Sequence, residues 1–400
     1  MINDKRYTVS STHRHRLLKH LRRRQFLQGA AVTIPSLLLS SCGWTIANVS
    51  PAASEEEEEE EDGESSEEAS APQTGSQDKL YIYTWAGYTD DELLDRFRQE
   101  TGIEVVADVF DSNEVMLAKI QASGGGGYSI IYPSEYMVIN MVELGILRKL
   151  DQSRIRGLDQ LFPNFRDPAY DPGNQYSVPL SWGTTGLVYN PNKLSQLPED
   201  WDYLWENSQE IARRVTLPND VREVMGATLS SLGYSYNSTD YQEIKQAYEK
   251  LVELKPTIAS LNSDAWRTQI LSGDLFMAMC YSSDATEVID ENEDLEYIVP
   301  DSGSSVWVDT LVIPRSAPNL DAAYAWINFM LKPEIAARIC QRLHFSVPSE
   351  AAYNLLPQDI QNDYTLYPPE SVLEKCEGLI PLDEKVNEIY DRFWTQLTSG

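Results

Sequence analysis

Apolar residues recur along residues 79–144 with spacings that alternate between those of a strand and those of a helix. Leu80–Thr84 is a short apolar run typical of a buried strand. Leu93, Leu94 and Phe97 then fall on one face of a helix predicted over 90–101, which Gly102 ends. The same alternation predicts strands at 103–110 and 128–132, and helices that begin at Ser112 and at Ser134, the second running to Leu144.

A β-α-β-α-β-α order indicates an α/β fold with a parallel sheet covered by helices. The glycine run 124–127 lacks the Lys-Ser/Thr of a phosphate loop and precedes a strand, so a turn is expected there. Further along, the pattern predicts helices at 241–254, 263–272, 320–331, 334–343 and 382–397, a helix start at 200–205, and strands at 275–281 and 310–313.

The N-terminal segment has the layout of an export signal. Arg22–Arg24 precede Gln25-Phe26-Leu27 and an apolar run over 29–39, a spacing similar to that of a twin-arginine signal. Leu39–Cys42 resembles a lipobox, whose Cys42 would be lipidated; the alternative is a short uncleaved anchor with an incidental cysteine. We therefore expect a signal over 1–42, followed by a disordered tether over 43–78, of which 55–78 is strongly acidic.

The bulk composition narrows the class of protein. The 400 residues are long enough for two domains, and 42% of them are hydrophobic. The formal net charge of −30 disfavours nucleic-acid binding and favours cationic ligands, although halophily or solubility explains acidity equally well. Only His344 among the four histidines lies in the predicted folded part, which argues against histidine-based catalysis or a histidine-rich metal site.

Three cysteines besides Cys42 remain: Cys280, Cys340 and Cys376. In an oxidising compartment one pair is expected to form a disulfide, with Cys340–Cys376 preferred. The alternative is that all three are small buried residues.

Aromatic and hydroxyl side chains recur where predicted strands end. Trp85 and Tyr88 follow the first strand, Ser134 and Tyr136 follow the third, and Tyr281 closes the strand at 275–281. Ligands of open parallel sheets bind beyond the carboxyl ends of the strands, so these positions predict a site for an organic ligand.

The chain resembles the periplasmic spermidine/putrescine-binding protein family from about residue 79 to 400. Single matching stretches are weak, but their shared order over some three hundred residues is specific. They include Tyr83-Thr84-Trp85, Glu100-Thr101-Gly102-Ile103, Ser112-Asn113-Glu114, Pro133-Ser134, Ser177-Val178-Pro179, Asp220 with Arg222-Glu223, Leu232-Gly233-Tyr234, Asn262-Ser263-Asp264, Trp307 with Asp309, and Thr365–Pro368.

The resemblance implies a two-lobed periplasmic-binding-protein fold of type II, each lobe a mixed, mainly parallel sheet flanked by helices. One lobe would be 79–183 plus 309–353, and the other 184–308 plus 354–400. Carboxylates would hold the ammonium groups of a polyamine and aromatic side chains would line its methylenes. By resemblance, the ligand-binding residues are Trp85, Tyr88, Ser134, Tyr136, Asp220, Glu223, Tyr281, Trp307, Asp309 and Phe345.

Each of these residues has a structural alternative. Trp85 and Tyr88 are otherwise core or edge aromatics, and Ser134 is otherwise a helix N-cap. Asp220 and Glu223, spaced i and i+3 on one helical face, are otherwise a solvated helix start, with Arg222 free to pair with either.

Asp309 interrupts an apolar run beside Trp307, so a buried acid there needs a partner. The family uses this acid to grip an amine. Its structural alternative is to cap a backbone amide.

The sequence departs from the family at several site positions. Ala86 and Gly87 replace polar residues, one of them acidic, while Tyr281 stands where tryptophan is usual and Phe345 where tyrosine is usual. The loss of an acid favours a shorter diamine as a hypothesis.

By resemblance, the chain would be a monomeric receptor that delivers a polyamine to the permease subunits of an ABC importer. It would be exported, would touch the membrane only through a lipid anchor, and would need no cofactor. Three alternatives remain: a receptor for another cationic or polar solute or for ferric iron, a sensory subunit, and a secreted hydrolase that uses two carboxylates such as Asp309 and Glu223. No nucleophile elbow, zinc motif or Cys/His dyad supports an enzyme.

Overall fold

The computed structural model describes residues 79–110, 112–124 and 127–399; the predicted export signal, the predicted lipidation site Cys42 and the predicted tether lie outside these ranges. The strands are β1 (Lys79–Trp85), β2 (Glu104–Phe110), β3 (Ile130–Ile131), β4 (Ser177–Tyr189), β5 (Val215–Leu217), β6 (Ile258–Leu261), β7 (Met277–Tyr281), β8 (Glu296–Ile298), β9 (Ser305–Val312) and β10 (Glu377–Gly378).

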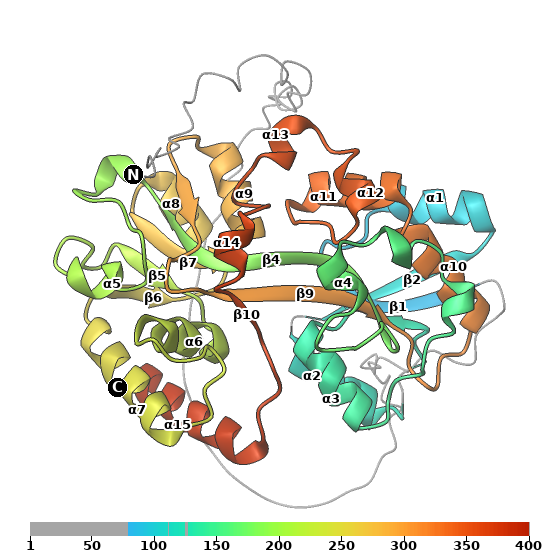
Figure 1. Cartoon of the computed structure of the whole chain (residues 1–400), viewed down its shortest axis with the longest axis horizontal. Coiled ribbons are helices and arrows are strands. Elements are labelled where there is room, and N and C mark those ends of the chain that lie inside the picture. Colours follow the sequence, from blue (N-terminus) through green and yellow to red (C-terminus); the bar gives the residue numbers. More distant parts are fainter. Residues whose placement is uncertain (1–78, 111, 125–126, 400) are drawn as a thin grey trace, which may run out of the picture. The chain divides into compact units, whose positions relative to one another are not determined.

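The α-helices (Figure 1) are α1 (Asp91–Thr101), α2 (Asn113–Ala122), α3 (Glu135–Glu143), α4 (Pro163–Arg166), α5 (Tyr203–Glu206), α6 (Val221–Ser231), α7 (Tyr241–Leu254), α8 (Trp266–Ser272), α9 (Ser282–Glu291), α10 (Leu320–Met330), α11 (Pro333–Leu343), α12 (Glu350–Tyr353), α13 (Gln358–Gln361), α14 (Glu370–Leu373) and α15 (Glu384–Ser399). Short 3₁₀ turns lie at Gln152–Arg154, Leu158–Gln160 and Pro191–Lys193.

The first group of strands is parallel, as the sequence pattern predicts. β1 pairs in parallel with β2, from Lys79↔Glu104 to Trp85↔Phe110, and with β3 through Ile82↔Ile130. The helices α1 and α2 connect these strands, as each crossover between parallel strands requires. The carboxyl ends of β1 and β3 therefore lie at one edge of the sheet, where Trp85 ends β1 and Ser134 follows β3.

A long antiparallel pair, β4 and β9, continues the sheet (Figure 1). β9 pairs with β3 on one side and with β4 on the other, so the strand order is β2-β1-β3-β9-β4-β7-β5-β6. The first part of β4 pairs with β9, and its second part pairs with β7 and β8. All residues of β4 are buried, because the strand has neighbours on both edges and packed side chains on both faces.

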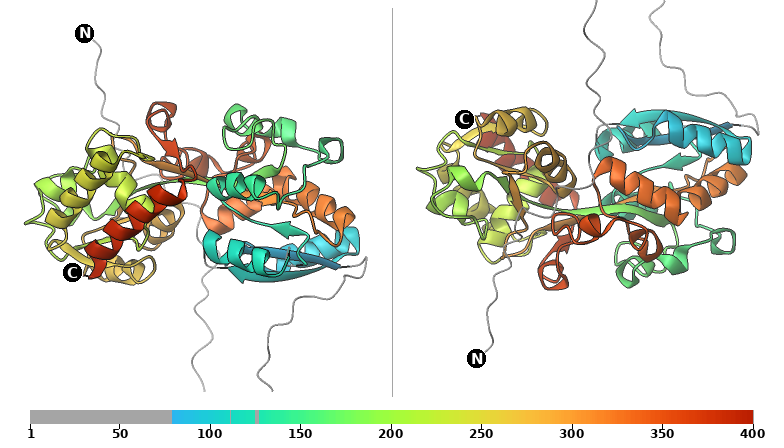
Figure 2. Two further views of the ribbon diagram at one scale, coloured as in Figure 1. Left: turned by 90° about the horizontal axis from the view of Figure 1, so that it is seen from below. Right: turned by 90° about the horizontal axis from the view of Figure 1, so that it is seen from above.

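Two large hydrophobic cores flank this pair of strands. One surrounds β1 and β3 and includes Ile82 of β1. In this core the ring of Phe97 from α1 packs edge-on against that of Trp326 from α10. The other includes Trp201 and Tyr390 and lies where α15 packs against α7 and α6. Figure 2 shows helices on both faces of the sheet in each core. The α/β prediction is confirmed, while the lobe boundaries at 183, 308 and 353 stay a prediction.

The strongly periodic elements fall where the sequence places them. α1 and α2 begin after Asp90 and Ser112, whose side chains accept hydrogen bonds from Leu93 N at 2.7 Å and Val115 N at 3.2 Å. α7, α10, α11 and α15 match their predicted ranges within two residues. The strand predicted at 310–313 is longer and begins at Ser305. The sequence reading did not identify β4 or α9.

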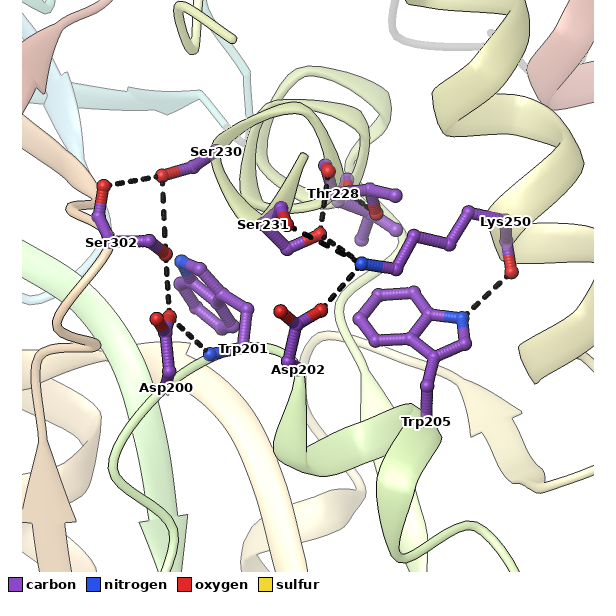
Figure 3. A network of polar contacts seen from close by, with 10 residues as sticks. Asp200, Trp201, Asp202, Trp205, Thr228, Ser230, Ser231, Lys250 and Ser302 are labelled. Atoms are coloured by element: carbon purple, nitrogen blue, oxygen red, sulfur yellow. Dashed lines mark hydrogen bonds and ion pairs between the residues drawn. The ribbon is translucent and has the colours of Figure 1, made fainter. Parts of the chain in front are cut away.

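A polar network fastens the turn at residues 200–205 to α6 and α7 (Figure 3). The Lys250 ammonium contacts Asp202 Oδ1 at 2.5 Å and Ser231 Oγ at 2.9 Å, and it lies over the Trp205 ring. The Trp205 indole in turn donates to the Lys250 carbonyl at 2.8 Å. The helix predicted to start at Asp200 begins at Tyr203. The residues before it are held by other segments: Lys250 contacts Asp202, the Ser302 hydroxyl donates to Asp200, and the Trp201 indole donates to the Gly303 carbonyl at 2.9 Å.

The preferred Cys340–Cys376 disulfide is wrong in this structure. Cys280, Cys340 and Cys376 are all free thiols. Cys340 is buried on α11 within 3.8 Å of the Tyr367 hydroxyl, whereas Cys376 Sγ donates to the Val372 carbonyl at 3.4 Å. The alternative of small buried residues holds for Cys280 and Cys340, and Cys376 is half-buried.

Among residues 79–399 as described, no helix is long and apolar enough to cross a membrane.

Candidate functional site

Asp309 lies on β9 and is buried, with only 8% of the residue exposed to solvent. Ser134 Oγ donates to its Oδ1 at 2.8 Å, and the Tyr88 hydroxyl donates to its Oδ2 in a short hydrogen bond. Tyr88 also shares a hydrogen bond of 3.1 Å with Ser181 Oγ on β4. The alternative in which Asp309 caps a backbone amide is therefore wrong, because its partners in the described residues are side chains.

Burial decides the protonation of this carboxyl group. Loss of solvation raises the pKa of Asp309 to about 6, although the hydrogen bonds from Tyr88, Ser134 and Trp85 lower it in part. Such a carboxylate is ionised at neutral pH and still has lone pairs left after two donors. It is suited to accept a cationic hydrogen-bond donor.

Ser134 occupies the N-cap position of α3 without capping it. Its side chain makes no hydrogen bond to its own helix. Instead, Oγ accepts from Asn113 Nδ2 at 3.1 Å, and the Ser134 N–H donates to Asn113 Oδ1 at 3.1 Å. An antiparallel bridge joins Ser134 to Asp309 along the backbone. The starts of α2 and α3 are thus tied together and to β9, which fixes the serine hydroxyl on the acid.

Aromatic rings surround this acid. The Tyr88 ring packs at 5.3 Å from Phe345 and edge-on at 6.0 Å from Tyr132. Trp85 packs on Phe110 at 4.4 Å. Phe345 is almost wholly buried and its ring supports that of Tyr88. A direct contact of Phe345 with a ligand stays a prediction.

Asp220 supplies a second carboxylate, at the N-terminus of α6. Its Oδ1 accepts from Arg222 N at 2.9 Å and Glu223 N at 3.0 Å, which makes it the helix cap, while its Oδ2 lies 3.5 Å from the Tyr281 hydroxyl. Burial raises the pKa of Asp220, and the negative charge of Glu114 raises it further, against the two amide hydrogen bonds. The Tyr281 ring stands edge-on to Trp307 at 6.1 Å.

Glu223 is buried, so the alternative of a solvated helix start is wrong for this residue. Its side chain is 2% exposed, and its Oε2 accepts from Tyr236 Oη at 2.9 Å and Ser305 Oγ at 2.8 Å. Burial raises the pKa of Glu223 to about 7, with the charge of Asp220 as the second cause. It points into the protein, where it links α6 to β9.

Arg222 forms no ion pair with Asp220 or Glu223 in the described residues. Its guanidinium donates to Asn237 Oδ1 at 3.0 Å and to the Ile380 carbonyl. It holds the segment after β10 against α6, and its charge lowers the pKa of Asp220 only from a distance.

Glu114 belongs near this group, and sequence reasoning missed it as a site residue. The Tyr136 hydroxyl, from the first turn of α3, donates to Glu114 Oε1 at 2.9 Å. Burial raises the pKa of Tyr136, and the charges of Glu114 and Asp220 raise it further. The only signal in the sequence was the matching stretch Ser112-Asn113-Glu114, and an acid in the first turn of a helix is too common to mark a site.

The structure therefore gathers three carboxylates, each receiving an O–H group from a tyrosine: Asp309 with Tyr88, Glu114 with Tyr136, and Asp220 with Tyr281. The indole nitrogen of Trp307 is buried and has no hydrogen-bond partner in the described residues, while the Trp85 indole interacts with Asp309 and lowers the pKa of that acid. Within those residues, no group of three His, Cys, Asp or Glu side chains is arranged to hold a metal ion. The arrangement offers anionic acceptors between aromatic rings.

Comparison with known proteins gives this arrangement a family context. The family model of bacterial extracellular solute-binding proteins matches residues 92–368. The spermidine/putrescine-binding periplasmic protein of Salmonella typhimurium is 34% identical over 332 residues, which cover 83% of this chain and 94% of that relative.

Two solved structures show the same fold. The spermidine/putrescine ABC transporter substrate-binding protein PotD from Streptococcus pneumoniae is 39% identical, with a TM-score of 0.74 over 80% of this chain and 98% of its own. The Tp0655 (TpPotD) lipoprotein of Treponema pallidum is 31% identical, with a TM-score of 0.73 over 80% of this chain and 99% of its own. The likeness thus covers these relatives almost from end to end.

Proposed function

Since the chain belongs to the bacterial extracellular solute-binding proteins, and among them to the spermidine/putrescine-binding family, we propose that it binds a polyamine outside the cytoplasm and delivers it to the permease of an ABC importer. The observation that carries the proposal is the set of three carboxylates with tyrosine donors, Asp309, Glu114 and Asp220. A linear polyamine carries ammonium groups at fixed intervals, and each needs an anionic acceptor when it leaves water.

The aromatic side chains fit the rest of such a ligand. Trp85, Tyr88, Tyr281 and Trp307 would pack along methylene groups and attract the cationic ends through their ring faces. Asp309 would hold one ammonium group together with Ser134, and Asp220 would hold another. Glu223 and Phe345 would act indirectly, by supporting Asp220 and Tyr88. The two lobes, with the boundaries inferred from the resemblance, would close around the ligand.

Gly87 makes a diamine the favoured ligand. It lies at a positive φ of 79°, which glycine adopts without strain, and its carbonyl accepts from Arg342 Nη1 at 2.7 Å, so this position of the loop after β1 carries no side-chain acid. Without an acid at position 87, the proposed site has fewer carboxylates to hold ammonium groups. We therefore infer a preference for putrescine over spermidine.

The lipid anchor is a separate part of the proposal. Cys42 ends a lipobox-like stretch, and one solved relative is itself called a lipoprotein. An acylated Cys42 followed by an acidic tether would hold the receptor near its permease. Labelling with a fatty-acid analogue should mark the chain and should fail to mark the Cys42→Ala variant; equal labelling of both would exclude the anchor at this residue.

Native mass spectrometry and calorimetry of the purified full-length chain test the ligand. We expect a co-purified or added diamine or triamine mass, and a Kd for putrescine lower than that for spermidine. Spermidine binding ten times tighter than putrescine would exclude the diamine preference. No binding of either, or turnover of an amine or glycan, would favour another solute, ferric iron or the hydrolase.

A matched pair of variants tests the site. Asp309→Asn should weaken binding by a factor of about 100 or more, because an ammonium group would lose its buried partner. Asp108→Asn is the control, since Asp108 also accepts from a tyrosine, Tyr128, but on β2 beside Lys119. Unchanged affinity in Asp309→Asn would mean that the ligand lies elsewhere.

A further inference from the structure

We propose that Glu114 is a specificity-determining residue that shares one ammonium group of the ligand with Asp220. This inference rests on the proposed polyamine function and deepens it. Glu114 lies on α2 and Asp220 caps α6, so the two acids come from segments more than a hundred residues apart in the chain. Each is held by the hydroxyl of a different tyrosine, Tyr136 or Tyr281.

The contacts and the electrostatics place Glu114, Tyr136 and Asp220 in one group. The Tyr136 hydroxyl donates to Glu114 Oε1 at 2.9 Å. Burial raises the pKa of Asp220 and that of Tyr136; the charge of Glu114 raises both further, and the charge of Asp220 adds to the effect on Tyr136. Neither Glu114 nor Asp220 forms an ion pair with a Lys, Arg or His among the described residues. The nearest basic residue to Asp220 in sequence, Arg222, is engaged with Asn237 and Ile380.

The position of Glu114 on its helix does not explain its contact. An acid in the first turn of α2 is favoured by the helix dipole wherever its side chain points. The Tyr136 hydroxyl comes from α3, whose start is tied to Asn113 on α2 and to Asp309 on β9 through Ser134. The carboxylate of Glu114 is therefore oriented by the same elements that orient the proposed acceptor Asp309.

An ammonium group between Glu114 and Asp220 would relieve their repulsion and use the lone pairs that the tyrosines leave free. Gly87 leaves the loop after β1 without a carboxylate, but Glu114 supplies one at the start of α2. The ligand would then meet two anionic positions, Asp309 at one and Glu114 with Asp220 at the other, which suits the two ammonium groups of a diamine.

Calorimetry with putrescine on the full-length chain tests the inference. Glu114→Gln should weaken binding about tenfold, because an exposed carboxylate contributes less than a buried one. Asp91→Asn is the control: Asp91 is an exposed acid in the first turn of α1 and contacts no site residue through a hydrogen bond or ion pair. It should leave the Kd unchanged.

A double-mutant cycle separates a shared ammonium group from two independent effects. If Glu114 and Asp220 hold the same cation, the loss in Glu114→Gln with Asp220→Asn should be smaller than the product of the two single losses. Independent, multiplicative losses would overturn the shared position. Wild-type affinity in Glu114→Gln would overturn the role of Glu114 and leave the proposed function standing, whereas a wild-type chain that binds no polyamine would remove both.

Discussion

The hydroxyl of Ser134 donates to Asp309 at 2.8 Å although Ser134 stands where a helix N-cap would turn back on its own helix. A helix start thereby gives up a stabilising contact to orient an acid on a neighbouring strand. The Ser112 side chain, at the start of α2, makes the ordinary cap to Val115 N. The two serines, close in sequence and alike in position on their helices, have different functions.

We expect Ser134→Ala to weaken putrescine binding by about three- to tenfold, because Asp309 loses one of its two hydroxyl donors. This substitution should change the free energy of unfolding less than the loss of a capping side chain does. Ser112→Ala should instead lower that free energy by about 1 kcal/mol with no change in Kd. Calorimetry and urea denaturation measure the two quantities. Equal effects of both substitutions on the Kd would contradict the division of roles.

Ligand affinity should fall at acid pH. The pKa of Asp309 is raised to about 6 in the free protein, so the carboxylate that accepts an ammonium group is present above this pH and is lost below it. A bound cation lowers the pKa of this acid, and each pH unit below about 6 should therefore weaken binding by up to about tenfold. The raised pKa of Asp220 acts in the same direction.

Titrations with putrescine at pH 5, 6, 7 and 8, in buffers of different ionisation enthalpy, measure both the affinity and the protons released on binding. Asp309→Asn should flatten the profile near pH 6. A wild-type affinity that is constant from pH 5 to 8 would show that no carboxylate with a raised pKa contacts the ligand.

Much of the fold could be predicted from the sequence because its elements carry local signals. β1 is a short apolar run, and α1 has an N-cap, one apolar face and a terminal glycine. β4 carries no such signal: it is buried on both faces, so its side chains do not alternate, and it contains proline and glycine. Strands of this kind are recognised only through their neighbours.

The site was predictable to the same extent. Residues directly after β1 and β3, such as Tyr88 and Ser134, follow from the topology of parallel strands. The inward direction of Glu223 and the contact of Glu114 with Tyr136 depend on how α6 and α2 pack against distant segments. Sequence spacing alone contains no information on that packing.

Glu135 should make stability depend on pH. This acid is 2% exposed, and its two oxygens accept from Val308 N at 2.8 Å and Leu379 N at 3.3 Å, so it joins α3 to β9 and to the segment after β10. Burial raises its pKa to about 8 in the folded chain. The folded state then holds a proton that the unfolded state releases above about pH 4.5, and stability is lost as the pH rises from there to about 8.

We expect the wild type to lose free energy of unfolding relative to Glu135→Gln between pH 5 and pH 8, by about 1–3 kcal/mol. At pH 5 the variant should be the less stable of the two, because its amide NH₂ faces one of the two backbone N–H donors. Urea denaturation of both chains at each pH gives the comparison. Parallel pH profiles would mean that Glu135 titrates normally.

Arg342 on α11 holds the loop between β1 and α1. Its guanidinium donates to the carbonyls of Gly87 at 2.7 Å and Tyr88 at 3.2 Å and pairs with Asp90 at 2.7 Å. Arg338, one turn earlier on α11, pairs with the same Asp90 but makes no hydrogen bond to the loop carbonyls. Arg342 is thus a positioning residue for the Tyr88 hydroxyl, whereas Arg338 is a matched control.

Arg342→Gln should weaken putrescine binding about five- to tenfold, because it loosens Tyr88. Arg338→Gln should leave the Kd unchanged while it lowers thermal stability by a similar amount. In Tyr88→Phe, which has no hydroxyl left to position, Arg342→Gln should have a smaller effect on the Kd. The same loss in both backgrounds would show that Arg342 acts through general stability and not through Tyr88.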